Sequence, residues 1–179
     1  EQAIAIQSDF SNAYYNLGNV LGELGQLDDA VKSYEKAIAI KPDYDEAHNN
    51  LGNAFQGLGQ LDAAVKCYEQ AIAIQSDFSN AYYNLGNVLR ELGQVDTAVR
   101  SYEKAIVIKP DYAKAHNNLG IALQDLGQMD NAVKNLEKAI AIKPDFAEAH
   151  HNLGIALQDL GQIDAAVKDY EKAIAIKPD

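Results

Sequence analysis

The apolar residues of this chain recur at helical spacing, and the spacing is interrupted at regular intervals. Between residues 11 and 24 the apolar positions fall three and four residues apart, which places them on one helical face: Ala13, Leu17, Val20, Leu21 and Leu24. Gly25 follows, where a left-handed helix cap costs least because glycine has no Cβ. A second apolar face runs from 28 to 40 and stops before Pro42, because the residue before a proline avoids helical geometry.

The same alternation returns along the sequence and predicts five pairs of helices. The expected pairs span 11–24 and 28–40, 45–58 and 62–74, 79–92 and 96–108, 113–126 and 130–142, and 147–160 and 164–176. Asp28 and Asp43 are expected to cap helix N-termini through their carboxylates, and Glu46 to complete a capping box with Asp43. Asp145 and Glu148 repeat that arrangement.

A strict period of 34 residues organises the chain. Five leucines hold the equivalent position in successive units: Leu17, Leu51, Leu85, Leu119 and Leu153. Such a period is typical of a solenoid, in which each unit stacks on its neighbours. The sequence therefore predicts one array over 1–179, with repeats at 11–44, 45–78, 79–112, 113–146 and 147–179, and the end of a preceding repeat at 1–10. Residues 1–21 reappear unchanged at 69–89, and we expect the array to be part of a longer one.

Charge and cysteine content narrow the function classes. The formal net charge is -11 and the sequence pI is about 4.7, which argues against nucleic-acid binding because that needs a basic face. No apolar run reaches the roughly 20 residues that a membrane-spanning helix needs. Cys67 is the only cysteine, so no internal disulfide forms, which fits a reducing, cytoplasmic location. Its equivalents in other units are polar, and we expect it to be exposed.

Counted from Ser11 as place 1, each unit carries a characteristic set of large and small residues. The first unit supplies, at places 4, 7, 8, 11, 20, 24, 27 and 32, Tyr14, Leu17, Gly18, Leu21, Ala30, Tyr34, Ala37 and Pro42. Over the whole chain this pattern resembles the tetratricopeptide repeat family. The resemblance implies an all-α fold, a right-handed α-solenoid superhelix of helix-turn-helix repeats. Gly18 and Ala30 are small, as they must be if the paired helices cross closely there.

The residue types that support catalysis or metal binding are not grouped in this sequence. His48, His116 and His150 replace the aromatic residue at place 4, where we expect them to pack between helices. The acidic pairs recur with the period and are interpreted as caps and solvated faces. We expect no catalytic residue, no metal site and no cofactor.

The resemblance also implies a binding surface, because first helices of the family line a concave groove. Its candidate residues are Asn16, Asn50, Asn84, Asn118 and Asn152 at place 6, Asn19, Asn53 and Asn87 at place 9, and Tyr15, Asn49, Tyr83 and Asn117 at place 5, with Arg90 and Lys114 beside them. An amide offers both donor and acceptor, so it can pair with the backbone of an extended peptide. The place-6 ladder resembles the superhelical domain of O-linked N-acetylglucosamine transferase. The alternative is that these asparagines bond a neighbouring helix.

Groove charge indicates the kind of partner. The groove edge carries more acidic than basic residues, namely Glu23, Glu46, Glu91, Asp125, Glu148 and Asp159. We therefore expect a neutral or basic protein segment as partner, bound more weakly as salt rises. The carboxylate clamp of the family is matched by Asn53, Asn84 and Lys114, but Asn49 and Asn118 stand where its other basic residues belong. Capture of an acidic tail is therefore disfavoured.

The sequence thus predicts a protein–protein interaction scaffold that binds an extended peptide and is not an enzyme. Two alternatives stay open. The chain is the substrate-recruiting arm of a glycosyltransferase-like enzyme whose catalytic domain lies elsewhere, or it is a designed or self-assembling array. We also expect helix 164–176 to expose an apolar face and to stack end to end with another copy.

Overall fold

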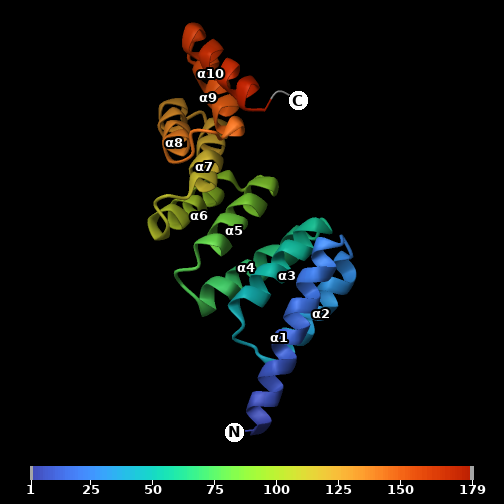
Figure 1. The fold of residues 1–179 in the computed structure, drawn as a ribbon. Helices are drawn as coiled ribbons and strands as arrows, with labels where there is room; N and C mark the ends of the chain where they lie inside the picture. Colours follow the sequence, from blue (N-terminus) through green and yellow to red (C-terminus); the bar gives the residue numbers. More distant parts are fainter. Residues whose placement is uncertain (1, 178–179) are drawn as a thin grey trace. The chain divides into compact units, whose positions relative to one another are not determined.

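The computed structural model describes the backbone of residues 2–177 and the side chains of residues 10–177. Over these residues the fold is all-α (Figure 1). Its helices are α1 (Gln2–Glu23), α2 (Leu27–Ile40), α3 (Asp45–Gly57), α4 (Leu61–Ile74), α5 (Ser79–Glu91), α6 (Val95–Ile108), α7 (Ala113–Asp125), α8 (Met129–Ile142), α9 (Ala147–Asp159) and α10 (Ile163–Ile176). The predicted helix pairs are confirmed, with boundaries that coincide or differ by one residue everywhere except at the start of α1, which begins at Gln2 rather than at residue 11.

The turn inside each pair is built on a glycine with positive φ. Gly25 has a φ of 73°, and its N–H donates to the carbonyl of Gly22 at 3.0 Å. The N–H of Gln26 then donates to the carbonyl of Leu21 at 2.9 Å, so the last turn of α1 is closed by a Schellman-type pair of bonds. The predicted left-handed cap is confirmed, and the equivalent glycine of every later pair has a φ between 71° and 76°.

The predicted carboxylate caps are wrong. The N-cap of α2 is Gln26 and that of α3 is Tyr44, and neither donates or accepts a side-chain cap bond. Asp28 already lies inside the first turn of α2, where its charge interacts with the helix dipole. Tyr44, one residue after the predicted cap Asp43, is buried, and α3 starts at Asp45 as predicted.

The same displacement repeats at α9. Its N-cap is the buried Phe146, without a side-chain cap bond, so Asp145 does not cap the helix either. Glu46 and Glu148 lie in the first turns of α3 and α9, where they face the positive end of the helix dipole.

The first helix is longer than predicted, because α1 is continuous from Gln2 to Glu23. The identical sequence at 69–89 forms the end of α4, a turn, and the start of α5. The second copy contains the end of a helix that packs along α3.

The helices form two compact units, Glu1–Val88 and Leu89–Asp179. In the first unit α1 packs on α2, α2 on α3, and α3 on α4, and α1 also contacts α3. In the second unit α6 packs on α7, α7 on α8, α8 on α9 and α9 on α10, and α7 also contacts α9. Within each unit, a first helix therefore lies beside the first helix of the adjoining repeat, which sets the face on which the candidate residues meet.

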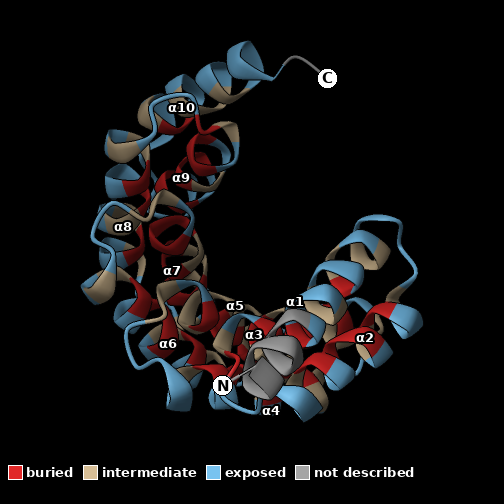
Figure 2. Ribbon diagram, turned by 60° about the horizontal axis from the view of Figure 1, so that its bottom comes forward, coloured by how far each residue is buried: buried red, intermediate tan, exposed pale blue. Residues whose placement is uncertain are grey.

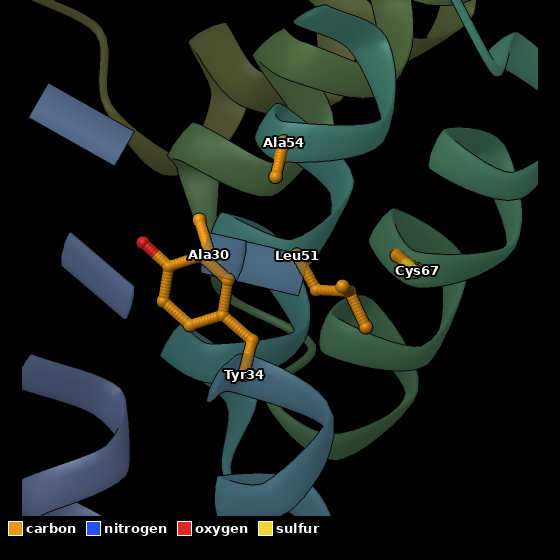
Figure 3. Packing of buried hydrophobic residues seen from close by; sticks show 5 residues of the cluster. All are labelled: Ala30, Tyr34, Leu51, Ala54 and Cys67. Carbon is orange, nitrogen blue, oxygen red and sulfur yellow. The ribbon is translucent and has the colours of Figure 1, made fainter. Parts of the chain in front are cut away.

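Small residues pack against a tyrosine ring and a leucine in the core of the first unit. In the first unit Ala30, Tyr34, Leu51, Ala54 and Cys67 form one cluster from α2, α3 and α4 (Figure 3). A Cβ on Gly18 would lie 2.5 Å from the Tyr34 ring, which confirms that the paired helices cross closely there. Buried residues lie on the helix faces turned toward neighbouring helices, and exposed residues on the faces turned away (Figure 2).

Candidate functional site

The place-6 asparagines donate hydrogen bonds across repeats. The Asn50 Nδ2 atom donates to the hydroxyl of Tyr15 at 3.2 Å and to the Oδ1 atom of Asn19 at 2.9 Å. Its Oδ1 atom accepts from the amide of Asn49 at 3.1 Å. An amide nitrogen carries two hydrogens, so both donors of Asn50 are used between α3 and α1.

The same arrangement recurs in the later repeats of each unit. Asn84 donates to Asn49 at 3.0 Å and to Asn53 at 3.1 Å, which connects α5 to α3. In the second unit Asn152 donates to Asn117 at 3.0 Å, which connects α9 to α7. The geometry therefore gives these place-6 amides the neighbouring-helix role that the sequence left open as the alternative.

Asn19 and Asn53, at place 9 of the first unit, accept hydrogen bonds from the protein through their side-chain oxygens, whereas the place-6 amides donate. The Oδ1 atom of Asn19 accepts from the Tyr34 hydroxyl at 2.9 Å in addition to Asn50. The Oδ1 atom of Asn53 accepts from Tyr68 at 2.8 Å and from Asn84 at 3.1 Å. Both carbonyl groups point inward, so the NH₂ groups are the parts that can still donate to a ligand. The Nδ2 atom of Asn53 makes only a long contact of 3.5 Å to Asn50 among the described residues.

These amides border a hollow of about 490 Å³ in the first unit. Its lining comes from α1, α2 and α3 and consists of Asn19, Gly22, Glu23, Leu27, Tyr34, Asn50, Asn53 and Ala54. The volume lies in the range of ordinary ligand pockets, roughly 300–1,000 Å³. The hollow thus combines two amide donors, one carboxylate and the apolar side chains of Leu27 and Ala54.

Comparison with known proteins identifies the repeat. Family models described as TPR repeat match residues 20–59, 57–89, 86–127 and 122–161. Models described as tetratricopeptide repeat match residues 147–179 and 1–32. The chain belongs to the tetratricopeptide repeat (TPR) family. TPR arrays are protein-interaction scaffolds, and this is the function class of the chain.

Solved structures agree with the TPR assignment. The crystal structure of MamA is similar with a TM-score of 0.82 and 28% identity, over 90% of this chain and 94% of that one. YrrB, described as a TPR protein with an unusual peptide-binding site, has a TM-score of 0.77 and 25% identity over 99% and 92% of the two chains. A thermophilic TPR protein of Thermus thermophilus has a TM-score of 0.74 and 25% identity over 94% and 92%. No curated protein sequence matches the chain.

The remaining candidate residues of the TPR array differ in accessibility. Asn16, Asn53 and Lys114 are exposed, whereas Asn49 and Asn117 are buried. The half-buried candidates are Tyr15, Asn19, Asn50, Tyr83, Asn84, Asn87, Arg90, Asn118 and Asn152. The Tyr15 ring is held against Tyr44, with 4.9 Å between ring centroids.

Arg90 is paired within the protein. Its Nε atom lies 2.6 Å from Oδ2 of Asp125, so the two side chains form a partly exposed ion pair. This pairing further weakens the match to a carboxylate clamp, because the basic residue beside the clamp positions already has an anionic partner.

The histidines at place 4 pack between helices, as predicted. His116 and His150 are buried and His48 is partly buried. His150 donates from Nδ1 to Asp169 Oδ1 at 2.8 Å, and its Nε2 atom lies 3.2 Å from the carbonyl oxygen of Pro144. The equivalent contact of His116 Nδ1 is to Asn135 Oδ1 at 3.2 Å.

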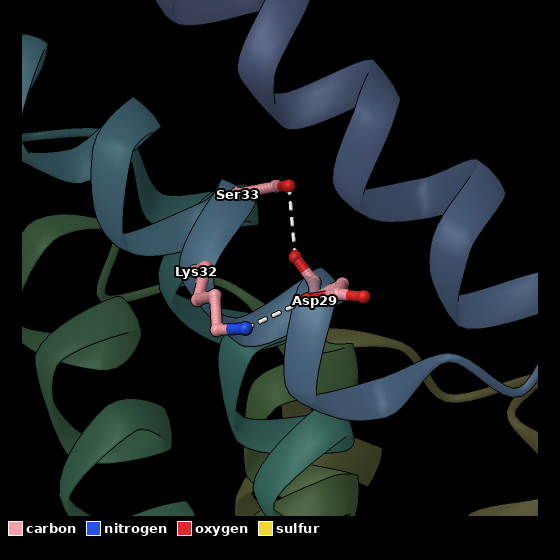
Figure 4. Close-up of polar contacts among 3 residues, drawn as sticks. All are labelled: Asp29, Lys32 and Ser33. Atoms are coloured by element: carbon pink, nitrogen blue, oxygen red, sulfur yellow. Dashed lines mark hydrogen bonds and ion pairs between the residues drawn. The ribbon is translucent and has the colours of Figure 1, made fainter.

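The prediction that Cys67 is exposed is wrong. Its side chain is buried against the first-unit core, and burial raises the pKa of the thiol to about 11. The equivalent Ser33 is also buried, and its hydroxyl donates to the carbonyl of Asp29 at 2.8 Å, beside the Lys32–Asp29 ion pair (Figure 4). The burial of Cys67 could have been predicted from helical spacing. Cys67 follows Ala64 by three residues and precedes Ala71 by four, so it lies on the same helical face as these two alanines, although the equivalent residues in other units are polar.

The described residues form neither a metal-binding cluster nor a membrane-spanning helix. Within residues 10–177, no group of three or more His, Cys, Asp or Glu side chains is placed to hold a metal ion. In the same part of the chain, none of the helices combines the length and the apolar character needed to cross a membrane.

Proposed function

We propose that this TPR array is a non-catalytic scaffold that binds an extended, neutral or basic polypeptide segment along its first helices. The best-defined subsite is the first-unit hollow, with Asn19 and Asn53 as donors and Glu23 as the anionic residue. One observation carries the proposal. The oxygens of both place-9 amides are bonded to the protein, which leaves their N–H groups for peptide carbonyls.

The peptide backbone fits this chemistry. Each residue of an extended segment presents a carbonyl oxygen, and successive residues advance about 3.3 Å. Adjacent packed helices are spaced about 8–10 Å apart, so equivalent amides on α1 and α3 would meet every third peptide residue or so. Glu23 would favour a lysine, an arginine or a free N–H group nearby and would disfavour acidic segments.

The proposal assigns different parts to the two rows of asparagine. Asn50 and Asn84 hold the helices in register with both of their amide hydrogens. Asn53 accepts those bonds and keeps its NH₂ group at an exposed position. A ligand would therefore contact the place-9 row first, while the place-6 row fixes the spacing of that row.

The test uses an isosteric substitution. Asn53→Asp keeps an oxygen to accept from Tyr68 and Asn84 but replaces the amide donor with a second oxygen. The probe is an uncharged peptide selected from a random library on the wild-type chain, and affinity is measured by fluorescence anisotropy. We expect the variant to bind about tenfold more weakly, the loss of one hydrogen bond of about 1.4 kcal/mol.

The matched control is Asn131→Asp, which adds the same charge at an exposed position in the first turn of α8 and is not among the residues that line the hollow. It should bind the peptide like the wild-type chain. Equal affinity of Asn53→Asp and the control, with unchanged helicity in both, would refute the assignment of the hollow as a peptide subsite.

A further inference from the structure

The first-unit hollow lies where one repeat lacks a side chain that the other repeats have. Gly22 holds place 12 of α1 and lines the hollow of about 490 Å³. A Cβ added to Gly22 would meet only the Tyr34 hydroxyl oxygen within 4 Å, at 3.8 Å, so the space beside this glycine is open. In the later repeats the same place carries a long side chain that can form hydrogen bonds, namely Gln56, Arg90, Gln124 and Gln158.

Two later repeats show which group fills this space. In the second repeat the Tyr68 hydroxyl bonds Oε1 of Gln56 at 3.3 Å and Oδ1 of Asn53 at 2.8 Å. In the fifth repeat the hydroxyl of Tyr170 donates to Oε1 of Gln158 at 2.9 Å. In both repeats a glutamine carboxamide therefore lies against the hydroxyl of the place-24 tyrosine.

The first repeat has the tyrosine without the glutamine. Tyr34 is buried, and its hydroxyl points away from Leu51 and Cys67 (Figure 3). This hydroxyl donates to Oδ1 of Asn19 at 2.9 Å, which is the equivalent of a bond that Tyr68 makes in the second repeat. Burial raises the pKa of Tyr34 to about 12, so the hydroxyl keeps its proton at neutral pH. The tyrosine is thus held as in the second repeat, but Gly22 supplies no carboxamide beside it.

The lining of the hollow discriminates among ligand groups. Glu23, next to Gly22, is an exposed residue of this lining. Its carboxylate would repel an acidic side chain, whereas the NH₂ group of a carboxamide can donate to it. Leu27 and Ala54 offer apolar surface to a methylene stem. The lining therefore fits a neutral side chain with an apolar stem and a carboxamide end, which is the chemistry of glutamine.

We propose that the first-unit hollow holds a glutamine side chain of the bound polypeptide, in the space that Gln56 and Gln158 fill in their own repeats. Gly22 is then the residue that determines specificity, because its lack of a side chain makes room for the side chain of the ligand. This inference rests on the proposed function and adds the identity of one ligand residue to it.

The test fills the space with a glutamine of the chain itself. Gly22→Gln gives the first repeat the residue that the second and fifth repeats have at this place. Helicity, measured by circular dichroism, should be retained because glutamine favours a helix more than glycine does. The matched control is Ala73→Gln, at an exposed position of α4 that is not among the residues lining the hollow.

The probes are peptides selected from a random library on the wild-type chain, and we expect them to share a glutamine. In fluorescence anisotropy, such a peptide should bind about tenfold more weakly to Gly22→Gln and with wild-type affinity to Ala73→Gln. Methionine in place of the shared glutamine keeps a side chain of similar length and removes the amide. This change in the peptide should weaken binding to the wild-type chain about tenfold and should have no further effect on Gly22→Gln.

The outcomes separate this inference from the proposed function. The glutamine site is refuted if the selected peptides share no glutamine, or if Gly22→Gln binds them as tightly as Ala73→Gln does. A shared lysine or arginine would indicate instead that Glu23 selects the ligand residue. In each of these cases, weaker binding to Asn53→Asp would still support the proposed function. If the wild-type chain selects no peptide at all, the inference and the proposed function both fail.

Discussion

The close approach of α3 to α4 can be tested by adding a single methyl group. A Cβ on Gly52 would lie 2.6 Å from Cε1 and 2.9 Å from Cδ1 of Tyr68. The ring is fully buried, and its hydroxyl donates to Asn53 at 2.8 Å, so it is held at both ends. Gly52→Ala must therefore push the two helices apart or rotate the ring out of its packing.

The magnitude follows from two opposing terms. Alanine is favoured over glycine in a helix by about 0.8–1 kcal/mol, which stabilises the variant. Overpacking a well-filled core costs about 1–3 kcal/mol, and the cost lies toward the upper end when the neighbour cannot move. We expect Gly52→Ala to lose about 1–2 kcal/mol of unfolding free energy in total.

Gly22→Ala is the matched control in the same unit. It lies in α1, and the nearest atom to its added Cβ is the Tyr34 hydroxyl oxygen at 3.8 Å, an ordinary contact. The helix-propensity gain applies to both variants, so the difference between them isolates the steric term. Urea unfolding followed by circular dichroism gives both values. If the two variants are equally stable, the helices do not cross as closely as Gly52 and Tyr68 indicate, and the reasoning fails.

Three further predictions concern buried polar groups. Burial raises the pKa of Cys67 from 9.0 to about 11, so the folded chain keeps a proton that the unfolded chain has released, and stability falls as pH rises from about 9 to about 11. Cys67→Ser should flatten this part of the urea-midpoint profile, and an unchanged slope would contradict it. Asp169→Ala should cost about 1–3 kcal/mol because buried His150 loses its acceptor, while Asp169→Asn should cost less, as measured by thermal unfolding. Asn84→Ala removes two hydrogen bonds between helices and should lower the free energy of unfolding by about 1–3 kcal/mol. Asn152→Ala removes the hydrogen bond to Asn117 and should have a higher melting temperature than Asn84→Ala. The reverse order of melting temperatures would count against a structural role for these amides.

Much of the fold was predictable because the same pattern of apolar residues and glycines recurs in five repeats. The helix pairs, the left-handed glycine turns and the packed histidines follow from spacing and from residue size. Helix starts were predicted to within one residue except at α1, but the capping residues were not, because the buried Tyr44 and Phe146 hold the N-cap positions next to the predicted aspartates. Residues 2–21 and 70–89 mark the limit of local reasoning, since the same sequence forms one continuous helix in the first case and a helix, a turn and a second helix in the other.

The sequence predicted which residues form the candidate site, but not which atom of each amide faces the protein and which faces a ligand. Sequence reasoning placed asparagines at places 6 and 9 on one face, and it left binding and helix-bonding roles open. Which end of an amide faces the protein depends on the hydroxyls of Tyr34 and Tyr68, which reach across from the second helices. That information is tertiary, so no pattern along the chain contains it.

The two units of the array offer different chemistry on equivalent faces. In the first unit, Asn53 at place 9 accepts from the place-6 amide of the next repeat and from a tyrosine, so it is held while its NH₂ group stays accessible. In the second unit, Ile121 and Ile155 stand at place 9 and can neither accept nor donate. The hollow there is lined by Ile121 and Ile174 beside His151. A peptide that relies on backbone hydrogen bonds is therefore expected to prefer the first unit, and an apolar side chain the second.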